Sequence, residues 1–498
     1  MSSPSRDGPD TSASVPRTDV LRWPVVGPFL RWRHSRLALQ VPMAVLALIL
    51  VLHGLFGPQL APKNLATLLV WVHWRGALVI GLLVLGNVFC LGCPLMLPRE
   101  LARRIVAPAR RWPRALRRKW IGIGLFVLVL FLYEWLDLWA SPRATALAIL
   151  AYFGAALAVD AFFAGAPFCK WICPIGQFNF VASTLSPLEV RPRDLGTCAS
   201  CATKDCIRGR REPATPSAPE ATAAIERSAP RITQRGCELD LFLPRKVGNL
   251  DCTFCMDCVH ACPVDNVAVA TRVPGEEWLV DAARSGIGRL SRRVDVAVLV
   301  VLFTFGALLN AFGMVAPVYA LQRTLAEFLG TNSEFVILGL LFVLGLAVVP
   351  ALCLGLVAVV ARTLTGAPAM RHLVRFSLSL CPLGFGVWLA HYSFHFLTGL
   401  WTFVPVTQLA LRRLGITLLG TPRWGLGGLH ESWVWPIELG FLGLGLVGSI
   451  AIAWRLAERD FGRRAPRAFA PWALLHLALA GTALWLLAQP MEMRGTFL

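Results

Sequence analysis

The chain has 498 residues, of which 56% are hydrophobic and only 15% are charged. An ordinary soluble surface needs more polar residues than this, so the composition favours a membrane protein in contact with the lipid bilayer. The formal net charge of +19 would indicate nucleic acid binding in a soluble protein. Here, however, the arginines gather in short segments beside long apolar runs, which is typical of membrane topology signals. Nucleic acid is therefore not an expected partner.

The N-terminal segment is polar. Residues 1 to about 24 are rich in Ser, Pro and Asp, and they contain no apolar core and no small-residue cleavage site. We therefore expect no signal peptide, and we expect residues 1–37 to form a disordered, basic tail in the cytoplasm.

Nine apolar stretches are long enough to cross a hydrocarbon layer of about 30 Å. They lie at about 38–57, 67–89, 120–140, 144–166, 294–316, 335–360, 374–398, 434–455 and 471–489. Dense arginine segments at 99–119, 361–376 and 456–467 alternate with loops of lower positive charge, so the N-terminus is expected inside and the C-terminus outside. The sequence predicts an α-helical polytopic membrane protein with about nine transmembrane helices.

These stretches divide the chain into a four-helix membrane domain at 38–189 and a five-helix membrane domain at 294–498. Between them, residues 190–275 are polar, contain eight cysteines and are expected in the cytoplasm. Within that segment, 208–233 lacks a periodic apolar face and predicts a flexible insertion. Residues 276–293 alternate apolar and basic positions at helical spacing, which predicts an amphipathic helix along the inner membrane surface.

The strongest motif is the run Cys252-x2-Cys255-x2-Cys258-x3-Cys262-Pro263. In bacterial ferredoxins this spacing places three thiolates on one [4Fe–4S] cluster and the fourth on a second cluster. A looser set of cysteines supplies the remaining ligands, so we predict an inserted α+β domain of the two-cluster bacterial-ferredoxin type. The expected ligands are Cys198, Cys201, Cys206 and Cys262 for one cluster, and Cys237, Cys252, Cys255 and Cys258 for the other. Four close thiolates also bind zinc, but this spacing is more typical of clusters.

Two further cysteine pairs, each ending in Cys-Pro, lie at the inner ends of predicted helices. They are Cys90-x2-Cys93-Pro94 after the second stretch and Cys169-x3-Cys173-Pro174 after the fourth. Four interpretations remain open for these boundary motifs: joint metal ligation, a redox-active disulfide, a quinone pocket, or simple buried thiols.

Ionisable residues inside predicted spans are costly and usually functional. Glu134 and Asp137 lie near the outer end of the third stretch, and we predict them as acceptors of protons released by a quinol. Interfacial acids that meet water are the alternative. His53 and His73 near the outer ends of the first two stretches are candidates for binding a haem or a quinone, although local hydrogen bonding is the commoner role.

The outer face of the second half carries a group of imidazoles and thioethers. His391 and His395 are four residues apart on one helix face. The other members, His430, Met491 and Met493, follow in the last outer loop and at the C-terminus. This ligand set suits copper or a haem, although such residues also occur at membrane surfaces without metal.

The segments FCKWICPIGQFNF and DCTFCMDCVHACPVD resemble the membrane polyferredoxins of the NapH and NosR type, over about residues 65–275. In that family the boundary motif usually reads C-x3-C-P twice, whereas the first copy here, FCLGCP, is one residue shorter. The resemblance implies a bacterial inner membrane protein that passes electrons between a quinol or a redox protein and cytoplasmic clusters. Its implied partner is a periplasmic reductase or cytochrome.

An electron-transfer protein is the first functional class, and the enzyme class considered for it is a component of a quinol dehydrogenase. Two other functional classes compete with it. The chain is also similar to the FixG and CcoG membrane ferredoxins, which implies a copper reductase or an assembly factor for a respiratory metalloenzyme. A redox-sensing regulator is the third class. The boundary cysteines and the outer His and Met residues suit the second class nearly as well as the first.

Overall fold

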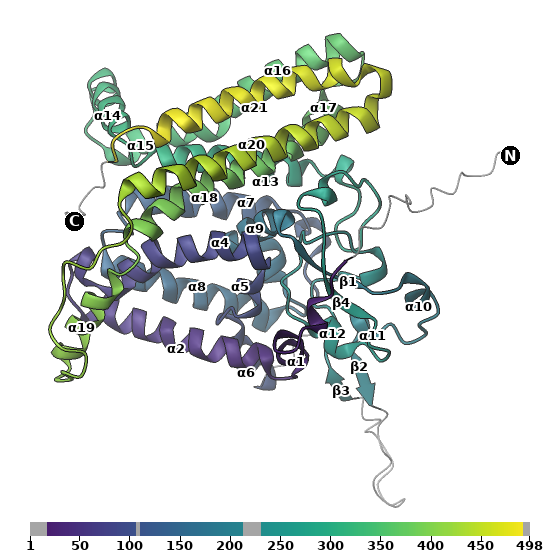
Figure 1. Cartoon of the computed structure of the whole chain (residues 1–498), viewed down its shortest axis with the longest axis horizontal. Helices are drawn as coiled ribbons and strands as arrows, with labels where there is room; N and C mark the ends of the chain where they lie inside the picture. Colours follow the sequence, from purple (N-terminus) through teal and green to yellow (C-terminus); the bar gives the residue numbers. More distant parts are fainter. Residues whose placement is uncertain (1–16, 106–109, 213–230, 492–498) are drawn as a thin grey trace, which may run out of the picture.

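The computed structural model describes residues 17–105, 110–212 and 231–491. Most of the predicted insertion 208–233, the start of the N-terminal tail and Met493 lie outside these ranges. The described chain is mostly helical, and its long apolar helices form a bundle with a small cysteine-rich module at one end (Figure 1). We call this end the module end. The opposite end, which carries α14 (Ala316–Leu329) and α19 (Phe403–Arg413), is the distal end (Figure 1).

Seven helical segments of the described chain are long and apolar enough to cross a membrane. They are Ser35–Phe56, Leu65–Leu85, Pro142–Phe162, Val294–Phe312, Glu334–Thr365, Ala369–Thr398 and Glu431–Leu487. The last one consists of two separate helices, α20 (Glu431–Phe461) and α21 (Ala465–Leu487), which turn back at Gly462 and run side by side (Figure 1). A shorter apolar helix, α7 (Trp120–Trp135), is a further candidate. The chain is therefore a multi-pass membrane protein in contact with the lipid bilayer.

Some helices begin or end a few residues away from the predicted stretches, because backbone conformation or a capping side chain fixes the boundary. The third stretch ends at Trp135 because Asp137 adopts a left-handed backbone with φ 45°. The next helix, α8 (Pro142–Phe162), begins early because the Ser141 side chain accepts from the amide of Ala144 and caps it. Proline at the first position of α8 suits a helix start.

The remaining bundle helices include several that are interrupted. α2 (Ser35–Phe56) is continuous, whereas the second span consists of α3 (Leu65–Thr67), a π-helical stretch at Leu68–Trp74 and α4 (Arg75–Leu85). The sixth stretch consists of α15 (Glu334–Val343), π-helix Leu344–Val348 and α16 (Val349–Thr365). The seventh consists of α17 (Ala369–Phe376), a 3-10 turn and α18 (Cys381–Thr398). At the module end lie the short helices α5 (Val88–Leu91), α6 (Met96–Ile105) and α9 (Pro174–Ala182).

The centre of the bundle is formed by α13 (Val294–Phe312) and α18, whose side chains are almost all buried. Their neighbours α20, α4 and α7 cover them on several sides. Close approach of α18 and α20 depends on glycine: a β-carbon added at Gly445 would lie 2.7 Å from the carbonyl oxygen of Pro382. Lipid cannot supply a hydrophobic driving force between helices, so this close contact contributes much of the packing.

Alanine at Gly445 should therefore separate α18 from α20. We expect Gly445→Ala to destabilise the protein by about 1–3 kcal/mol, because the added carbon meets helix backbone that has no free side chain to move. Thermal unfolding in detergent measures this. Gly443→Ala is the matched control, since an added carbon there meets nothing within 4 Å. Equal melting temperatures for the two variants would contradict the close-packed interface.

Two segments of the module end differ from expectation. The predicted helix over 276–293 is instead two 3-10 turns, Glu276–Trp278 and Leu290–Arg292, joined by irregular chain. The buried carboxylate of Glu277 explains this, because it pairs with Arg272 at 2.7 Å and accepts from the amide of Asn249 at 2.6 Å. The described part of the N-terminal segment is also ordered, with helix α1 (Val26–Arg31) and a core contact through the buried Val20 and Leu21.

The cysteine module is built on β1 (Leu188–Pro192) paired antiparallel with β4 (Val267–Thr271), in the register Leu188 opposite Thr271. Three short helices, α10 (Leu195–Ala199), α11 (Asp205–Arg208) and α12 (Asp257–Ala261), lie beside this sheet. The strands β2 (Arg210–Glu212) and β3 (Arg231–Gln234) form a second antiparallel pair, which holds the two described ends of the predicted insertion together. The module thus mixes short strands and helices around its cysteines.

Candidate functional site

All fourteen cysteines are free thiols, and twelve of them form three groups whose members lie within electrostatic reach of one another. Group 1 consists of Cys198, Cys201, Cys206 and Cys262. Group 2 consists of Cys237, Cys252, Cys255 and Cys258. Group 3 consists of the boundary cysteines Cys90, Cys93, Cys169 and Cys173. Each group combines segments that are far apart in the chain, so folding brings its members together.

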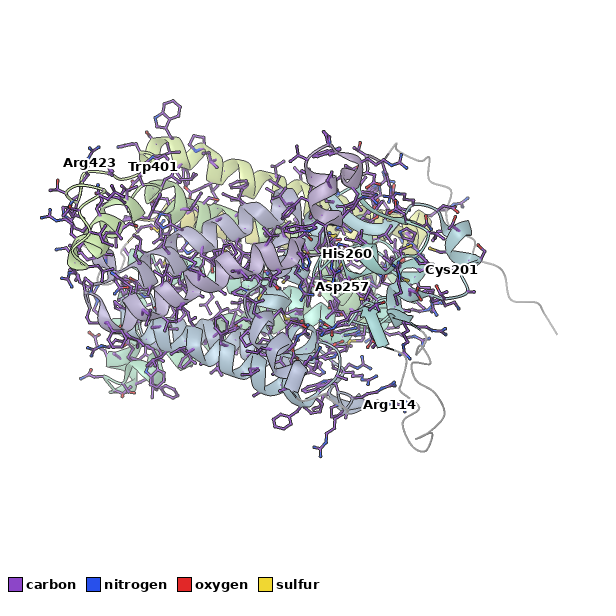
Figure 2. All side chains as sticks on the ribbon, turned by 90° about the horizontal axis from the view of Figure 1, so that it is seen from below. Arg114, Cys201, Asp257, His260, Trp401 and Arg423 are labelled. Carbon is purple, nitrogen blue, oxygen red and sulfur yellow. The ribbon has the colours of Figure 1, made fainter. Side chains whose placement is uncertain are left out.

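Group 1 is held by Asn266, directly before β4. Its side-chain amide donates to the Cys198 sulfur at 3.3 Å, and its main-chain amide donates to the Cys262 sulfur at 3.2 Å. Burial raises the pKa of Cys206 to about 11, and the nearby thiols of Cys198 and Cys262 raise it further. One residue therefore fixes two thiols of the group, and the third lies within their electrostatic reach. The fourth thiol, Cys201, lies farther out at the edge of the module (Figure 2).

Group 2 lies deeper, against the bundle. The run that carries it wraps tightly, since Asp251, Phe254 and Met256 all adopt left-handed backbone with φ of 64°, 54° and 62°. Burial raises the pKa of Cys237 to about 11, and the neighbouring thiol of Cys252 adds to this shift. Burial likewise raises the pKa of Cys258, with Cys237 and Cys252 as its nearest like charges. Thiols as buried as these stay protonated and inert unless a positive centre binds them.

A buried ion pair joins group 2 to the bundle. The Lys119 ammonium, at the start of α7, lies 2.5 Å from a carboxylate oxygen of Asp251 and donates to the carbonyl of Lys170 at 2.8 Å. Both partners of the pair are 1% exposed. Burial lowers the pKa of Lys119 to about 8, while the Asp251 carboxylate favours its charged form. Lys119 therefore holds three segments together: the start of α7, the segment that carries Cys169, and the turn before Cys252.

Further cations surround this junction. Arg99 of α6 is fully buried and pairs with Glu238 at 2.7 Å, next to Cys237. Arg103 pairs with the same carboxylate at 2.7 Å, and Arg36 of α2 lies 3.4 Å from Asp257 between Cys255 and Cys258. Figure 2 shows Asp257 at the boundary between the module and the bundle. Positive side chains placed here stabilise negative charge on the thiol side of the junction.

A large cavity of about 640 Å³ opens from this junction into the bundle. All four group 3 cysteines line it, together with Cys255 of group 2. Its walls are otherwise mainly apolar and aromatic side chains from α2, α4, α7, α8 and α18. The size and the lining are those of a site for a drug-sized apolar ligand with a few polar contacts.

The polar end of the cavity is built around Arg75, at the start of α4. Its guanidinium donates to the Tyr133 hydroxyl at 2.8 Å and to the carbonyl of Trp71 at 2.7 Å. The rings of Tyr133 and Tyr392 each lie 4.7 Å from it. Asn310 also lines the cavity, and its side-chain oxygen has no hydrogen-bond partner in the described structure. A cation, two phenols and an amide thus converge on one apolar space.

The predicted proton acceptors lie elsewhere. Glu134 borders a separate cavity of about 20 Å³ beside Gly313, and Asp137 forms the turn after α7. Asp160 lies at the module end, 3.6 Å from Arg99. The role of Glu134 and Asp137 in proton transfer stays a prediction, and the structure does not place either of them on the wall of the large cavity.

The predicted outer metal group is not brought together as a set. His391 and His395 are buried in α18 with ring centroids 5.0 Å apart. His430, in contrast, is exposed and caps α20 by accepting from the amide of Ser432. Met491 pairs with Val315 in an isolated bridge, and Met493 lies outside the described residues. Copper or haem binding by these residues stays a prediction.

The other single candidates have local partners. His53 accepts from the amide of Leu65 at 3.2 Å, whereas His73 lines the large cavity and contacts the carbonyl of Leu400. The two cysteines outside the three groups, Cys353 and Cys381, are free thiols, and the Cys381 sulfur lies 3.6 Å from the Thr184 hydroxyl. Of these residues, only His73 belongs to the cavity.

Three residues of the candidate site were absent from the sequence-based candidates: Lys119, Asn266 and Arg75. Lys119 directly precedes the third predicted stretch, whereas an ionisable residue inside such a stretch is itself a signal of function. Arg75 was detectable in this way, since it lies inside the second predicted stretch. Asn266 carries no such signal, because its importance comes only from its contacts with two sulfurs.

Within the described residues, no three His, Cys, Asp or Glu side chains are close enough to share a single metal ion. Thiolates around a [4Fe–4S] cluster bind four different iron atoms, so they stand farther apart than the ligands of one ion. The chain matches no family model, no curated protein and no solved structure.

Removing Lys119 should leave Asp251 buried without its partner. We expect Lys119→Met to destabilise the protein by about 3–5 kcal/mol, because breaking one side of a buried pair strands a charge. The double variant Lys119→Met/Asp251→Asn should recover part of this loss. Thermal unfolding in detergent compares the variants, with Lys63→Met at an exposed lysine as control. A single variant as stable as the parent would contradict the structural role of the pair.

Proposed function

We propose that this protein transfers electrons between a quinol in the large cavity and two [4Fe–4S] clusters held by groups 1 and 2. The observation that carries the proposal is that one cavity has Cys255 in its wall near the module and Arg75 with Tyr133 in its wall within the bundle. A quinol has an apolar tail and two polar oxygens, which fits an apolar cavity with a few convergent donors.

Groups 1 and 2 fit clusters by their chemistry. Each offers four free thiols, and main-chain and side-chain amides donate to two sulfurs of group 1. Hydrogen bonds to sulfur and burial are the features by which proteins tune cluster potentials. When bound, each cluster supplies a one-electron acceptor, so two of them match the two electrons that a quinol releases with two protons.

The cavity residues would do the binding work. Arg75 is positioned to donate to an oxygen of the quinol head group, and the aromatic side chains around it exclude water. The Tyr133 hydroxyl holds the guanidinium in place. Charge-assisted hydrogen bonds of this kind contribute about 1.5–3 kcal/mol.

The charge distribution supports a finer topology. Arginines at the ends of α6, α17 and α20 all lie at the module end, where Arg375 pairs with Asp460 at 3.2 Å. Positively charged loops stay in the cytoplasm, so we propose a bacterial inner membrane location with the module inside. Nine crossings, counting α7 and both α20 and α21, would place the C-terminus outside, where a periplasmic reductase or cytochrome would meet the protein.

The cluster assignment predicts a stepwise loss of iron. We expect Cys258→Ala, made and purified anaerobically, to contain about four irons and four sulfides fewer than the parent, because one [4Fe–4S] cluster loses a ligand. Iron and acid-labile sulfide analysis measures this. Cys353→Ala is the control and should lose none. An unchanged iron content in Cys258→Ala would refute the proposed clusters.

The quinol site predicts a selective loss. We expect Arg75→Gln to weaken quinol-dependent reduction of the clusters by roughly tenfold to a hundredfold, since a charge-assisted contact to the head group is lost. Electron paramagnetic resonance (EPR) after adding quinol measures the rate, and reduction by dithionite shows whether the clusters remain intact. Arg143→Gln, at an exposed position of α8, is the matched control. Wild-type kinetics in Arg75→Gln would rule out this quinol position.

A further inference from the structure

Group 3 lies between the cavity and group 2. Cys90 lies in α5 and Cys93 lies just after it, whereas Cys169 lies in the π-helical turn Phe168–Ile172 and Cys173 directly precedes α9. Two contacts join these two segments: the Cys169 sulfur lies 3.6 Å from the sulfur of Met96 in α6, and Asn179 of α9 donates to the Cys90 sulfur at 3.5 Å. All four thiols line the same empty space. The two motifs therefore form one site.

Group 3 shares a local geometry with the ferredoxin-type run. Cys173 caps α9, and its sulfur accepts from the amide of Gly176 at 3.2 Å, just beyond Pro174. The Cys262 sulfur accepts in the same way from the amide of Asn266, beyond Pro263. In both places a main-chain amide beyond the Cys-Pro pair donates to the sulfur, three residues after Cys173 and four residues after Cys262, and such a donor stabilises a thiolate.

Two buried polar atoms near group 3 have no hydrogen-bond partner in the described structure. The Arg99 side chain is fully buried, and its Nε atom has no hydrogen-bond partner in the described structure. The same holds for the side-chain oxygen of Asn179. Arg99 is close enough to influence the thiols of Cys93 and Cys169 electrostatically, and Cys93 is also within reach of Arg36. Cations beside four thiolates offset the negative charge of a bound cluster.

We propose that Cys90, Cys93, Cys169 and Cys173 ligate a third iron–sulfur cluster, of the [4Fe–4S] class, at the membrane boundary. Four thiols from two segments around one space supply one ligand to each of four irons. Group 2 is adjacent, because Asn87, three residues before Cys90, donates to the carbonyl of Cys252 at 3.0 Å. The site is argued from its own residues; only its place on an electron route from the cavity to group 2 rests on the proposed function.

The test is the iron and sulfide content of the full chain purified anaerobically, together with zinc and copper content. We expect about twelve irons in the parent and about eight in Cys93→Ala/Cys173→Ala, with cluster reduction by quinol slowed at least tenfold in the variant. Cys353→Ala is the control. Should the double variant fail to fold, Cys93→Ala alone and the number of reduced clusters counted by EPR in the parent provide the same comparison.

The outcomes separate the two proposals. About eight irons in the parent, unchanged in Cys93→Ala/Cys173→Ala, would overturn the third cluster while leaving the proposed function in place. Loss of one zinc or copper per chain from the variant would also overturn it, in favour of a single-ion site. Iron content that does not depend on Cys258 would instead refute the clusters of the proposed function, whatever group 3 contains.

Discussion

The buried Lys119–Asp251 pair is the constraint on which the arrangement of the site depends. Neither charge is tolerated alone in a dry interior, so the start of α7 and the turn before Cys252 must meet. Because the same ammonium also donates to the carbonyl of Lys170, the segment that carries Cys169 is fixed at the same point. The geometry of groups 2 and 3 thus follows from satisfying one buried cation.

Charge and apolar surface have separate roles around this junction. Arg36, Arg99 and Arg103 gather on the thiol side, where they compensate carboxylates and stabilise any negative centre that the thiols hold. Between this junction and Arg75, the cavity is lined mainly by apolar side chains. A neutral molecule with a long apolar tail enters such a space easily, whereas a charged one loses its hydration. The lining therefore favours a membrane-soluble ligand over a water-soluble one.

The central helices form a closely packed frame that fixes the position of the cavity walls. α13 and α18 are buried nearly throughout, and α20 approaches α18 closely at Gly445. Fixed helices keep Tyr392 of α18 against Arg75 of α4, at the polar end of the cavity. The less regular elements, such as the π-helical stretch at Leu68–Trp74, lie beside this end, where π-helical turns frequently mark functional sites.

The sequence by itself determined the membrane character, because apolar runs of this length have no other stable environment, and it located the cysteine motifs, because ligand spacing is a local property. It did not determine that 276–293 is irregular, since that outcome depends on the buried Glu277 and its partners from other segments. Only the tertiary structure decided that the two boundary motifs share one cavity wall and that Arg75 faces Tyr133, 58 residues away in the chain. Contacts between distant segments arise from packing, which no local pattern encodes.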